Sequence, residues 1–237
     1  FTLSDGAGLV TAHPQGISSS GNTGSIQVSG TRSFSTSADY TYNGTSSQVT
    51  GTGLPSSVRN LAVSNTAGVS LTSSVAIDQT LNLASGSFSV GGNTLTLNGP
   101  AISGTPGNLT TSSVSSLVFG GSSAGVLIPA SVASLNNLTI NNTNGVTVNS
   151  NITLGSGGVL TLTAGILNAG AYTVAVTNTA ASAVTGSANS FINVTTGGLQ
   201  RTLPSGLGGT GNNYLFPIGE GGTYRAINLI DVNTGST

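Results

Sequence analysis

The residues that could do chemistry are few and scattered along the chain. Five acids occur singly, with no two close together in the sequence: Asp5, Asp39, Asp78, Glu220 and Asp231. Enzymes that hydrolyse polysaccharides use a pair of carboxyl groups flanking the bond to be cleaved. Only Asp39 and Asp78 could approach each other, through the stacking of successive turns. We therefore expect no catalytic residue, and keep a carbohydrate-active enzyme as an alternative.

A metal or cofactor site is not expected. The single histidine, His13, lies in the turn-like stretch "TAHPQG" without a second ligand, and we expect it at the surface. Calcium-binding β-rolls need an Asp in every GGxGxD repeat. Here "GGTG" from Gly208 is followed by Asn212, and "GEGG" contains no Asp. Cys is absent, which removes disulfides and thiolate metal sites.

Two of the four arginines lie in the C-terminal part, near Glu220 and Asp231. They are Arg201 in "LQRTLP" and Arg225 in "TYRAIN". One interpretation is a capping ion pair, worth about 0–1 kcal/mol if exposed. The other is a junction with a further domain, and the sequence leaves both open.

Charge is unusually scarce. Only 4% of residues are charged, against about 25% in an ordinary soluble protein. No Asp, Glu, Lys, Arg or His occurs between Asp78 and Arg201. The net charge of −1 provides no field for phosphate backbones or anionic lipid, so we expect no nucleic-acid partner.

The chain is not expected to insert into a membrane or to be disordered. Its apolar runs are far shorter than the roughly 18 residues of a spanning helix. The aromatic girdles of a transmembrane barrel are missing, because Trp is absent and aromatics are 5%. A mean hydropathy of +0.24 with 36% apolar residues is enough to pack a core. The absence of an initiator Met and of a signal sequence leads us to expect a segment of a longer, processed polypeptide.

The hydrophobic pattern predicts short strands throughout. In "NLTINNTNGVTVNSNITL", Asn137 to Leu154, apolar residues come in pairs two apart, and the gaps hold Asn, Thr, Ser or Gly. The same pairs recur elsewhere, as in Leu61/Val63 and Leu81/Leu83, with turn residues between them. Period-two alternation bounded by turn residues is typical of strands, and no helical period appears. The chain is expected to be all-β.

An internal repeat favours a solenoid over a closed sandwich. The segment starting at Asn60 aligns with the segment starting at Asn137 at an offset of 77, and after a two-residue slip the match continues at 79. The repeat covers 42–97 and 119–176. Within each copy, a shorter rhythm of 20 to 22 residues contains three strands, as one turn of a three-sided parallel β-helix requires.

Stacking explains the missing charge. Each residue of such a coil lies about 4.8 Å from its counterpart one turn away. Like charges at that spacing repel, whereas stacked Asn side chains form hydrogen-bonded ladders and Gly supplies positive φ at corners. We predict a right-handed parallel β-helix over 1–198. Residues 199–237, which contain Pro204 and Pro217, are predicted to be a cap or the start of a following β-sandwich-like module.

Two surface features carry little functional weight. Asn-x-Thr triplets are expected from a composition this rich in Asn and Thr, so they are weak glycosylation signals. They include those that begin at Asn43, Asn108, Asn137, Asn151 and Asn193. "TLT" occurs at 94–96 and 161–163, but no long T-x-T ladder is visible, so ice binding is a minor alternative.

Nearly the whole chain resembles a known kind of repeat region. The stretches that carry this likeness are "YTYNGTSSQVTGTGLPSSVRNLAVSN", "TLTLTAGILNAGAYTVAV" and "YLFPIGEGGTYRAINL". They are similar to repeats of very large Bacteroidota surface proteins that are exported by type IX secretion and act as adhesins, some in gliding motility. The resemblance implies a secreted, cell-surface, non-catalytic β-helical stalk or filament. The C-terminal sorting domain of that pathway is not among these residues.

The expected function is therefore cell adhesion by a structural segment of a large extracellular protein. The expected partners are neighbouring repeats of the same polypeptide, identical copies stacked end to end, or a surface polysaccharide or abiotic surface. The alternatives are the carbohydrate-active enzyme and a self-assembling extracellular fibre subunit, since open solenoid ends invite strand addition.

Overall fold

The computed structural model describes residues 1–99 and 102–235. They form two compact units, Phe1–Thr111 and Ser112–Thr237, called unit 1 and unit 2 below. The first copy of the predicted repeat lies in unit 1 and the second lies in unit 2. Both units consist of short, mostly parallel strands stacked as a β-solenoid, with only two 3₁₀ turns among the described residues. The predicted parallel β-helix is confirmed.

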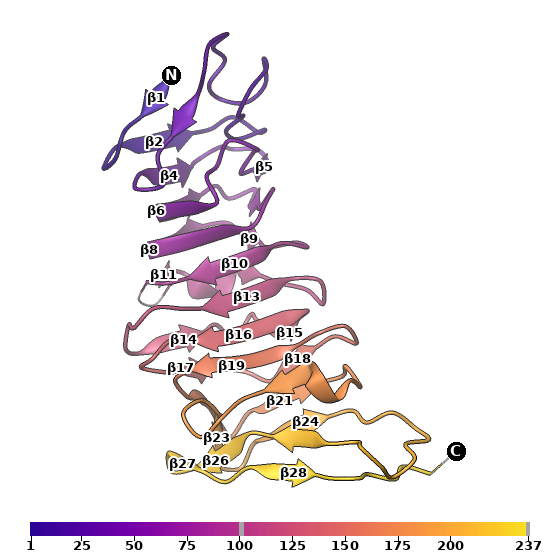
Figure 1. Ribbon diagram of the computed structural model, residues 1–237. Helices are drawn as coiled ribbons and strands as arrows, with labels where there is room; N and C mark the ends of the chain where they lie inside the picture. Colours follow the sequence, from indigo (N-terminus) through magenta and orange to yellow (C-terminus); the bar gives the residue numbers. More distant parts are fainter. Residues whose placement is uncertain (100–101, 236–237) are drawn as a thin grey trace. The chain divides into compact units, whose positions relative to one another are not determined.

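Unit 1 stacks its strands in two main parallel sheets (Figure 1). The main sheet contains, in order, β2 (Gly8–Thr11), β4 (Asp39–Tyr42), β6 (Ser57–Ser64), β8 (Val75–Ser85) and β10 (Thr94–Leu97), and β11 (Ser103–Gly104) also pairs with β8. The second sheet contains β5 (Gln48–Val49), β7 (Val69–Ser70), β9 (Phe88–Ser89) and β12 (Leu109–Thr110), which follows the 3₁₀ turn η1 (Pro106–Asn108). A short pair, β1 (Thr2–Leu3) and β3 (Ser33–Phe34), completes the unit.

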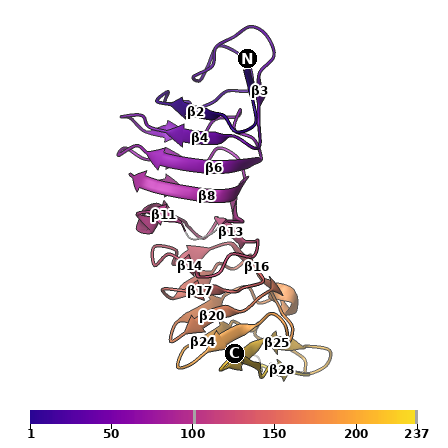
Figure 2. The same cartoon turned by 90° about the vertical axis from the view of Figure 1, so that its left-hand side faces the viewer.

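Unit 2 has three sheets, parallel except for the last strand pair of sheet 2, so each turn contributes three strands (Figures 1 and 2). Sheet 1 contains β13 (Ser116–Phe119), β16 (Asn137–Asn141), β19 (Leu160–Ala164) and β22 (Val184–Thr185). Sheet 2 contains β14 (Val126–Ile128), β17 (Val146–Val148), β20 (Leu167–Gly170), β23 (Ile192–Val194), β26 (Ile218–Glu220) and β27 (Thr223–Tyr224). Sheet 3 contains β15 (Ser134–Leu135), β18 (Ile152–Leu154), β21 (Thr173–Val176) and β24 (Gly198–Arg201).

The C-terminal part of unit 2 departs from the parallel pattern. The strands β25 (Tyr214–Phe216) and β28 (Ile227–Leu229) pair antiparallel, and so do β26 and β27. The second 3₁₀ turn, η2 (Ala181–Ala183), lies against β25. This change falls within the predicted cap, 199–237, although the predicted boundary itself stays a prediction.

Inward-facing residues stack into apolar rows, because alternate residues of a strand face the same side. In unit 1 one row contains Tyr40, Leu61 and Leu81, which pair in register and are buried. In unit 2 the equivalent row contains Leu117, Leu138, Leu160 and Val184. Each row removes its side chains from water along the whole stack, which is the main stabilising term of the fold.

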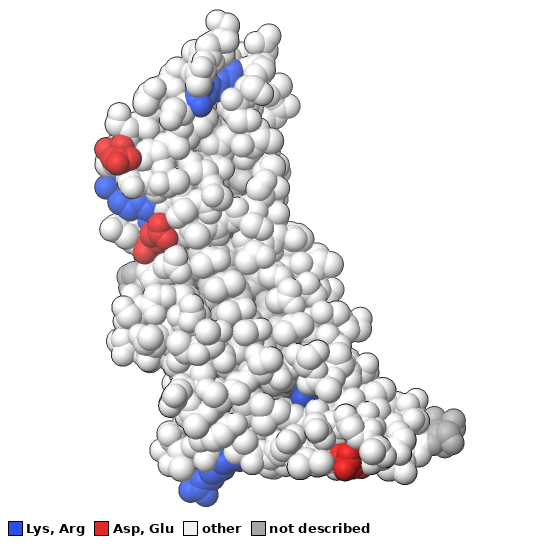
Figure 3. Space-filling model, in the orientation of Figure 1, with Lys and Arg blue, Asp and Glu red and all other residues white. Residues whose placement is uncertain are grey.

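The outer surface is nearly free of charge. Figure 3 shows one face, mostly white, with acidic and basic side chains confined to small patches. No helix among the described residues has the length and apolar character needed to cross a membrane.

Candidate functional site

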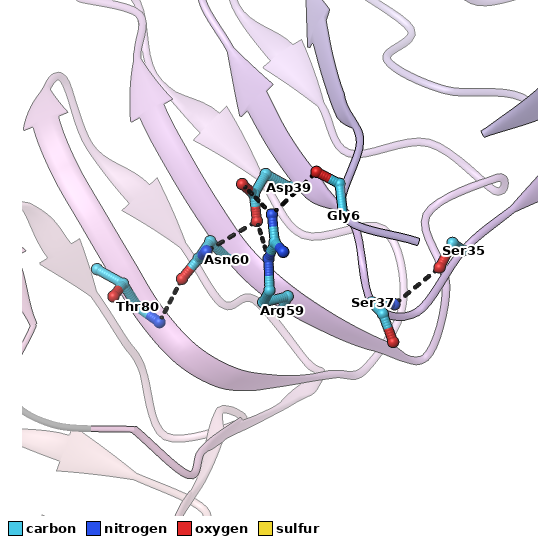
Figure 4. A network of polar contacts seen from close by, with 7 residues as sticks. All are labelled: Gly6, Ser35, Ser37, Asp39, Arg59, Asn60 and Thr80. Atoms are coloured by element: carbon cyan, nitrogen blue, oxygen red, sulfur yellow. Dashed lines mark hydrogen bonds and ion pairs between the residues drawn. The ribbon is translucent and has the colours of Figure 1, made fainter. Parts of the chain in front are cut away.

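The principal cluster of charged and polar side chains lies on the outside of the main sheet of unit 1 (Figure 4). We call Asp39, Arg59, Asn60 and Thr80 the polar ladder. Asp39, on β4, pairs in register with Asn60 on β6, and Asn60 pairs with Thr80 on β8. Asp39, Asn60 and Thr80 are each followed by a buried row residue, which turns these three positions outward.

The ladder is closed by short, directed hydrogen bonds. Arg59 donates from Nε to Oδ1 of Asp39 and from Nη2 to Oδ2, both at 2.7 Å. Asn60 Nδ2 donates to Oδ1 of Asp39 at 2.7 Å, and Oδ1 of Asn60 accepts from the Thr80 backbone N–H at 2.9 Å. Arg59 Nη2 also reaches the Gly6 carbonyl, 3.2 Å away. The two-pronged pairing holds the carboxylate in one orientation.

The electrostatics keep this pair ionised. The hydrogen bond from Arg59 has the largest effect and lowers the pKa of Asp39; burial opposes it in part, and the bond from Asn60 lowers the pKa further. The same bond raises the pKa of Arg59. A carboxyl group that acts as a general acid near neutral pH needs a raised pKa. Asp39 is therefore unsuited to the general-acid role, whereas the second carboxylate of such a pair works in the ionised form.

Asp78, the other member of the suspected carboxylate pair, belongs to a separate set of contacts. Its Oδ2 accepts from Ser57 Oγ at 2.8 Å, and its Oδ1 accepts from Asn98 Nδ2 at 2.9 Å. In the strands that follow, Asn60 and Thr80 occupy the positions in register with Asp39, and no hydrogen bond joins Asp39 to Asp78. Stacking brings Asp39 and Asp78 onto the same sheet, but each carboxylate is bonded to its own partners.

The remaining predicted residues do not gather into a site. Nδ1 of the half-buried His13 accepts from the Gln15 backbone N–H at 3.1 Å. Asp5 accepts from the Ser35 hydroxyl, and Asp231 accepts from the Gly211 backbone N–H at 2.7 Å. Among the described residues, no three His, Asp or Glu side chains come together as metal ligands.

Arg201 is held by carbonyl oxygens and aromatic rings. Its guanidinium donates to the carbonyls of Leu215 at 2.9 Å, Ala180 at 2.8 Å and Ala181 at 2.9 Å. It also lies 5.1 Å from the ring centre of Tyr214, and burial lowers its pKa. In the described part of the chain the one ion pair joins Arg59 and Asp39, so the capping ion pair considered from the sequence does not form.

Three asparagines of the Asn-x-Thr triplets serve the solenoid. Oδ1 of Asn137 accepts from the Val159 backbone N–H, and Oδ1 of Asn151 accepts from that of Thr173. Asn193 bonds to Asn168 and to the Gly222 backbone. The sequence analysis missed this role and did not single out Arg59. The sequence did contain a signal for the bond between Asp39 and Asn60. The two residues are 21 positions apart, which is close to the predicted length of one turn.

The threonine triplets lie on different strands. Thr161 stacks between Thr139 and Thr185 on sheet 1 of unit 2, which makes a row of three hydroxyls. Thr94 and Thr96 lie on β10 of unit 1. Sheet 1 of unit 2 therefore contains one short threonine row among its described strands. The neighbouring pair Asn141 and Ala164 does not extend it into a second threonine row.

Comparisons with protein-family models, with curated proteins and with solved structures gave no match for this chain.

Proposed function

We propose that the chain is a non-catalytic structural and adhesive segment of a large secreted protein, and that its stacked turns form a stiff stalk at the cell surface for attachment or motility. The observation that carries this proposal is the repeated bonding of each turn to the next. Backbone ladders, buried apolar rows and outward amide side chains all join neighbouring turns in both units. A chain whose every turn is hydrogen-bonded and packed against the next resists extension, as a load-bearing stalk must.

The bonding of the acidic side chains supports a role without catalysis. Asp39 is ionised and paired with Arg59, and Asp78 is occupied by Ser57 and Asn98. These carboxylates are bonded to side chains on neighbouring turns, and the hollow that Asp39 lines contains no second acidic residue among the described ones. An uncharged outer surface of Thr, Ser and Asn offers many weak hydrogen-bonding contacts instead, which suits distributed adhesion.

Display on an inert bacterial host tests the proposal directly. Cells that carry the chain should attach to glass coated with polysaccharide under flow, more strongly than cells that carry a shuffled sequence of the same composition. The same chain incubated with soluble polysaccharides should release no reducing ends and no unsaturated products. Release of either product would establish the enzyme alternative, and absence of attachment to every coating would reject adhesion.

A fibre subunit is the second candidate function, and one observation favours it. Strand β28 pairs with β25 on one side, and exposed apolar side chains lie on it and directly after it: Ile227 is 50% and Leu229 36% exposed on the strand, and the following Ile230 is 64% exposed. Exposed apolar edge strands recruit other strands. Light scattering should show concentration-dependent growth that Ile227→Lys and Ile230→Lys abolish, and a wild-type chain that stays monomeric at all concentrations would exclude this role.

A further inference from the structure

The outward face of sheet 3 in unit 2 carries side-chain hydroxyl and amide groups, and most of them make no hydrogen bond within the described part of the protein, unlike those of the polar ladder. Its outward residues are Asn151, Thr153, Thr173, Ala175 and Gln200, which line a shallow hollow on β18, β21 and β24. We call this set the sheet 3 platform. Thr153, Ala175 and Gln200 pair in register on successive turns, and Figure 1 shows the three strands stacked.

The polar groups of the platform are available to a ligand. Within the described residues, the Thr153 and Thr173 hydroxyls and the Gln200 amide make no hydrogen bond to the protein. Asn151 uses only its Oδ1, toward the Thr173 backbone N–H at 2.9 Å. In the polar ladder, by contrast, the carboxylate and amide groups are bonded to one another.

An exposed aromatic residue lies next to the platform in the sequence. Tyr172 immediately precedes Thr173, is 38% exposed, and its hydroxyl makes no hydrogen bond to the described residues. Its backbone is fixed, because the Gly198 N–H donates to the Tyr172 carbonyl at 3.2 Å and a side chain at Gly197 would meet that carbonyl 2.0 Å away. The backbone of this exposed tyrosine is therefore held in place directly before the platform residue Thr173.

We infer that the sheet 3 platform, with Tyr172, binds an extended neutral polysaccharide; this inference rests on the adhesive function proposed above and names its ligand class. Hydroxyl and amide groups match sugar hydroxyls, and the tyrosine ring provides an apolar surface for a sugar ring. No ionisable residue belongs to the platform, and the nearby Arg201 guanidinium is engaged by Leu215, Ala180 and Ala181. An anionic polymer would find no cation here, and a flat sheet face suits a flat, ribbon-like chain.

Unit 1 contains a natural contrast to this platform. By the internal repeat, Asn93 takes the place of Tyr172, Ala76 that of Thr153, and Thr96 that of Ala175. Asn93 turns its amide toward the carbonyls of Leu71 and Val90, at 2.8 and 3.2 Å. The equivalent face of unit 1 therefore has no aromatic ring and no free amide at that corner, and it supplies matched control positions.

Native affinity electrophoresis of the full chain tests the inference, with gels that contain hydroxyethyl cellulose, xyloglucan, polygalacturonate or no polymer. We expect retardation in at least one of the two neutral gels and none with polygalacturonate. Tyr172→Ala and Gln200→Ala should each weaken the apparent affinity about fivefold. Thr96→Ala in unit 1 should leave it unchanged, and thermal unfolding should confirm that all variants fold.

Several outcomes would overturn the inference. These are no retardation in either neutral gel, retardation only with polygalacturonate, and retardation that survives both Tyr172→Ala and Gln200→Ala. The flow assay separates this failure from that of the proposed function. Attachment that persists in Tyr172→Ala cells would remove the platform as the binding site and leave adhesion standing, whereas a wild-type chain that does not attach would remove adhesion itself.

Discussion

Unit 1 and unit 2 build the same corner from related residues. Asn65 in unit 1 and Asn142 in unit 2 are both fully buried, and each accepts a backbone N–H two residues ahead through its Oδ1. Each also donates from Nδ2 to a serine carbonyl of the preceding turn, Ser46 at 2.8 Å and Ser123 at 3.0 Å. The two copies thus retain the contacts that satisfy buried backbone groups at the bend.

The outward ladder shows what differs between the copies. In unit 2, Asn137 Nδ2 donates to the Ser116 hydroxyl at 3.2 Å, and its Oδ1 accepts from the Val159 N–H at 3.0 Å. These bonds match those of Asn60 in unit 1, except that Ser116 stands where Asp39 stands, and Asn136 stands where Arg59 stands. The amide rung is common to both units, and the ion pair is a local addition to it.

The two-residue slip in the repeat also has a structural cause. In unit 1, Ile77 and Leu81 both lie within the single long strand β8, joined through Asp78, Gln79 and Thr80. In unit 2 the matching residues, Leu154 and Leu160, belong to separate strands, β18 and β19, with Gly155–Val159 between them. Two extra residues convert a bulged strand into a corner, and unit 2 thereby gains a separate third sheet.

The corner glycines should give the largest effects, and equal ones in the two units. Gly86 and Gly165 have φ of +73° and +75°, and a Cβ would lie 1.7 Å from the Asn65 carbonyl oxygen or 1.8 Å from that of Asn142. Gly86→Ala and Gly165→Ala should each cost about 3 kcal/mol or more, from strain plus the clash. Urea unfolding measures the loss. Gly92→Ala, in open space without positive φ, is the control, and a large effect at only one corner would break the equivalence.

Replacing the corner asparagines, Asn65 and Asn142, should give the next largest losses of stability, and the two losses should differ. Asn65 also donates to Oε1 of the buried Gln48, 2.8 Å away, and Gln48 bonds onward to Gly44, Thr11 and His13. Unit 2 has Gly125 at the position of Gln48. Asn65→Ala should therefore lower the free energy of unfolding by about 2–3 kcal/mol and Asn142→Ala by about 1–2 kcal/mol. Equal losses in urea titrations would mean that Gln48 adds nothing to the corner.

Much of the fold was predictable because solenoid stacking imposes its period on the sequence. The pairs Leu61/Val63 and Leu138/Ile140 predicted strands β6 and β16, and the repeat gave the turn length that the register confirms. Side-chain pairing across turns was harder to predict. The bond from Asn60 to Asp39 depends on which outward residues of neighbouring strands lie in register. A one-residue bulge, such as that between Val58 and Asn60, shifts this register. The platform was not predicted because Thr153, Ala175 and Gln200 come together on successive turns only through the register of β18, β21 and β24.

Replacing the buried tyrosines of unit 1 by the residues of unit 2 should remove a sensitivity to alkali. Burial raises the pKa of Tyr40 to about 12 and raises that of Tyr42 still further, whereas unit 2 has Leu117 and Phe119 in these places. Unfolded tyrosine loses its proton near pH 10, so stability is fully present below pH 10 and declines as the pH rises toward and above 12. Tyr42→Phe should cost about 1 kcal/mol at pH 7, because it removes the 2.8 Å bond to the Thr50 carbonyl.

Circular dichroism melts between pH 8 and pH 12 measure this change. The difference in stability between wild type and Tyr42→Phe should shrink as the pH rises, since the variant has one fewer group to titrate on unfolding. A constant difference across that range would show that Tyr42 is accessible to hydroxide in the folded chain.

The ion pair of the polar ladder should give the smallest effect, and only in acid. Asp39 has a lowered pKa in the folded chain, so its contribution is present above its unfolded value of about 3.8 and disappears as the pH falls through the lower folded value. Both side chains are about one-third exposed, with 31% for Arg59 and 38% for Asp39, so solvent screens the pair.

The double change Asp39→Ser with Arg59→Asn copies Ser116 and Asn136 of unit 2. It should leave the melting temperature at pH 7 nearly unchanged and reduce the loss of stability between pH 4 and pH 2. A large loss at pH 7 would mean that the charges, and not the amide rung common to both units, hold this face of unit 1 together.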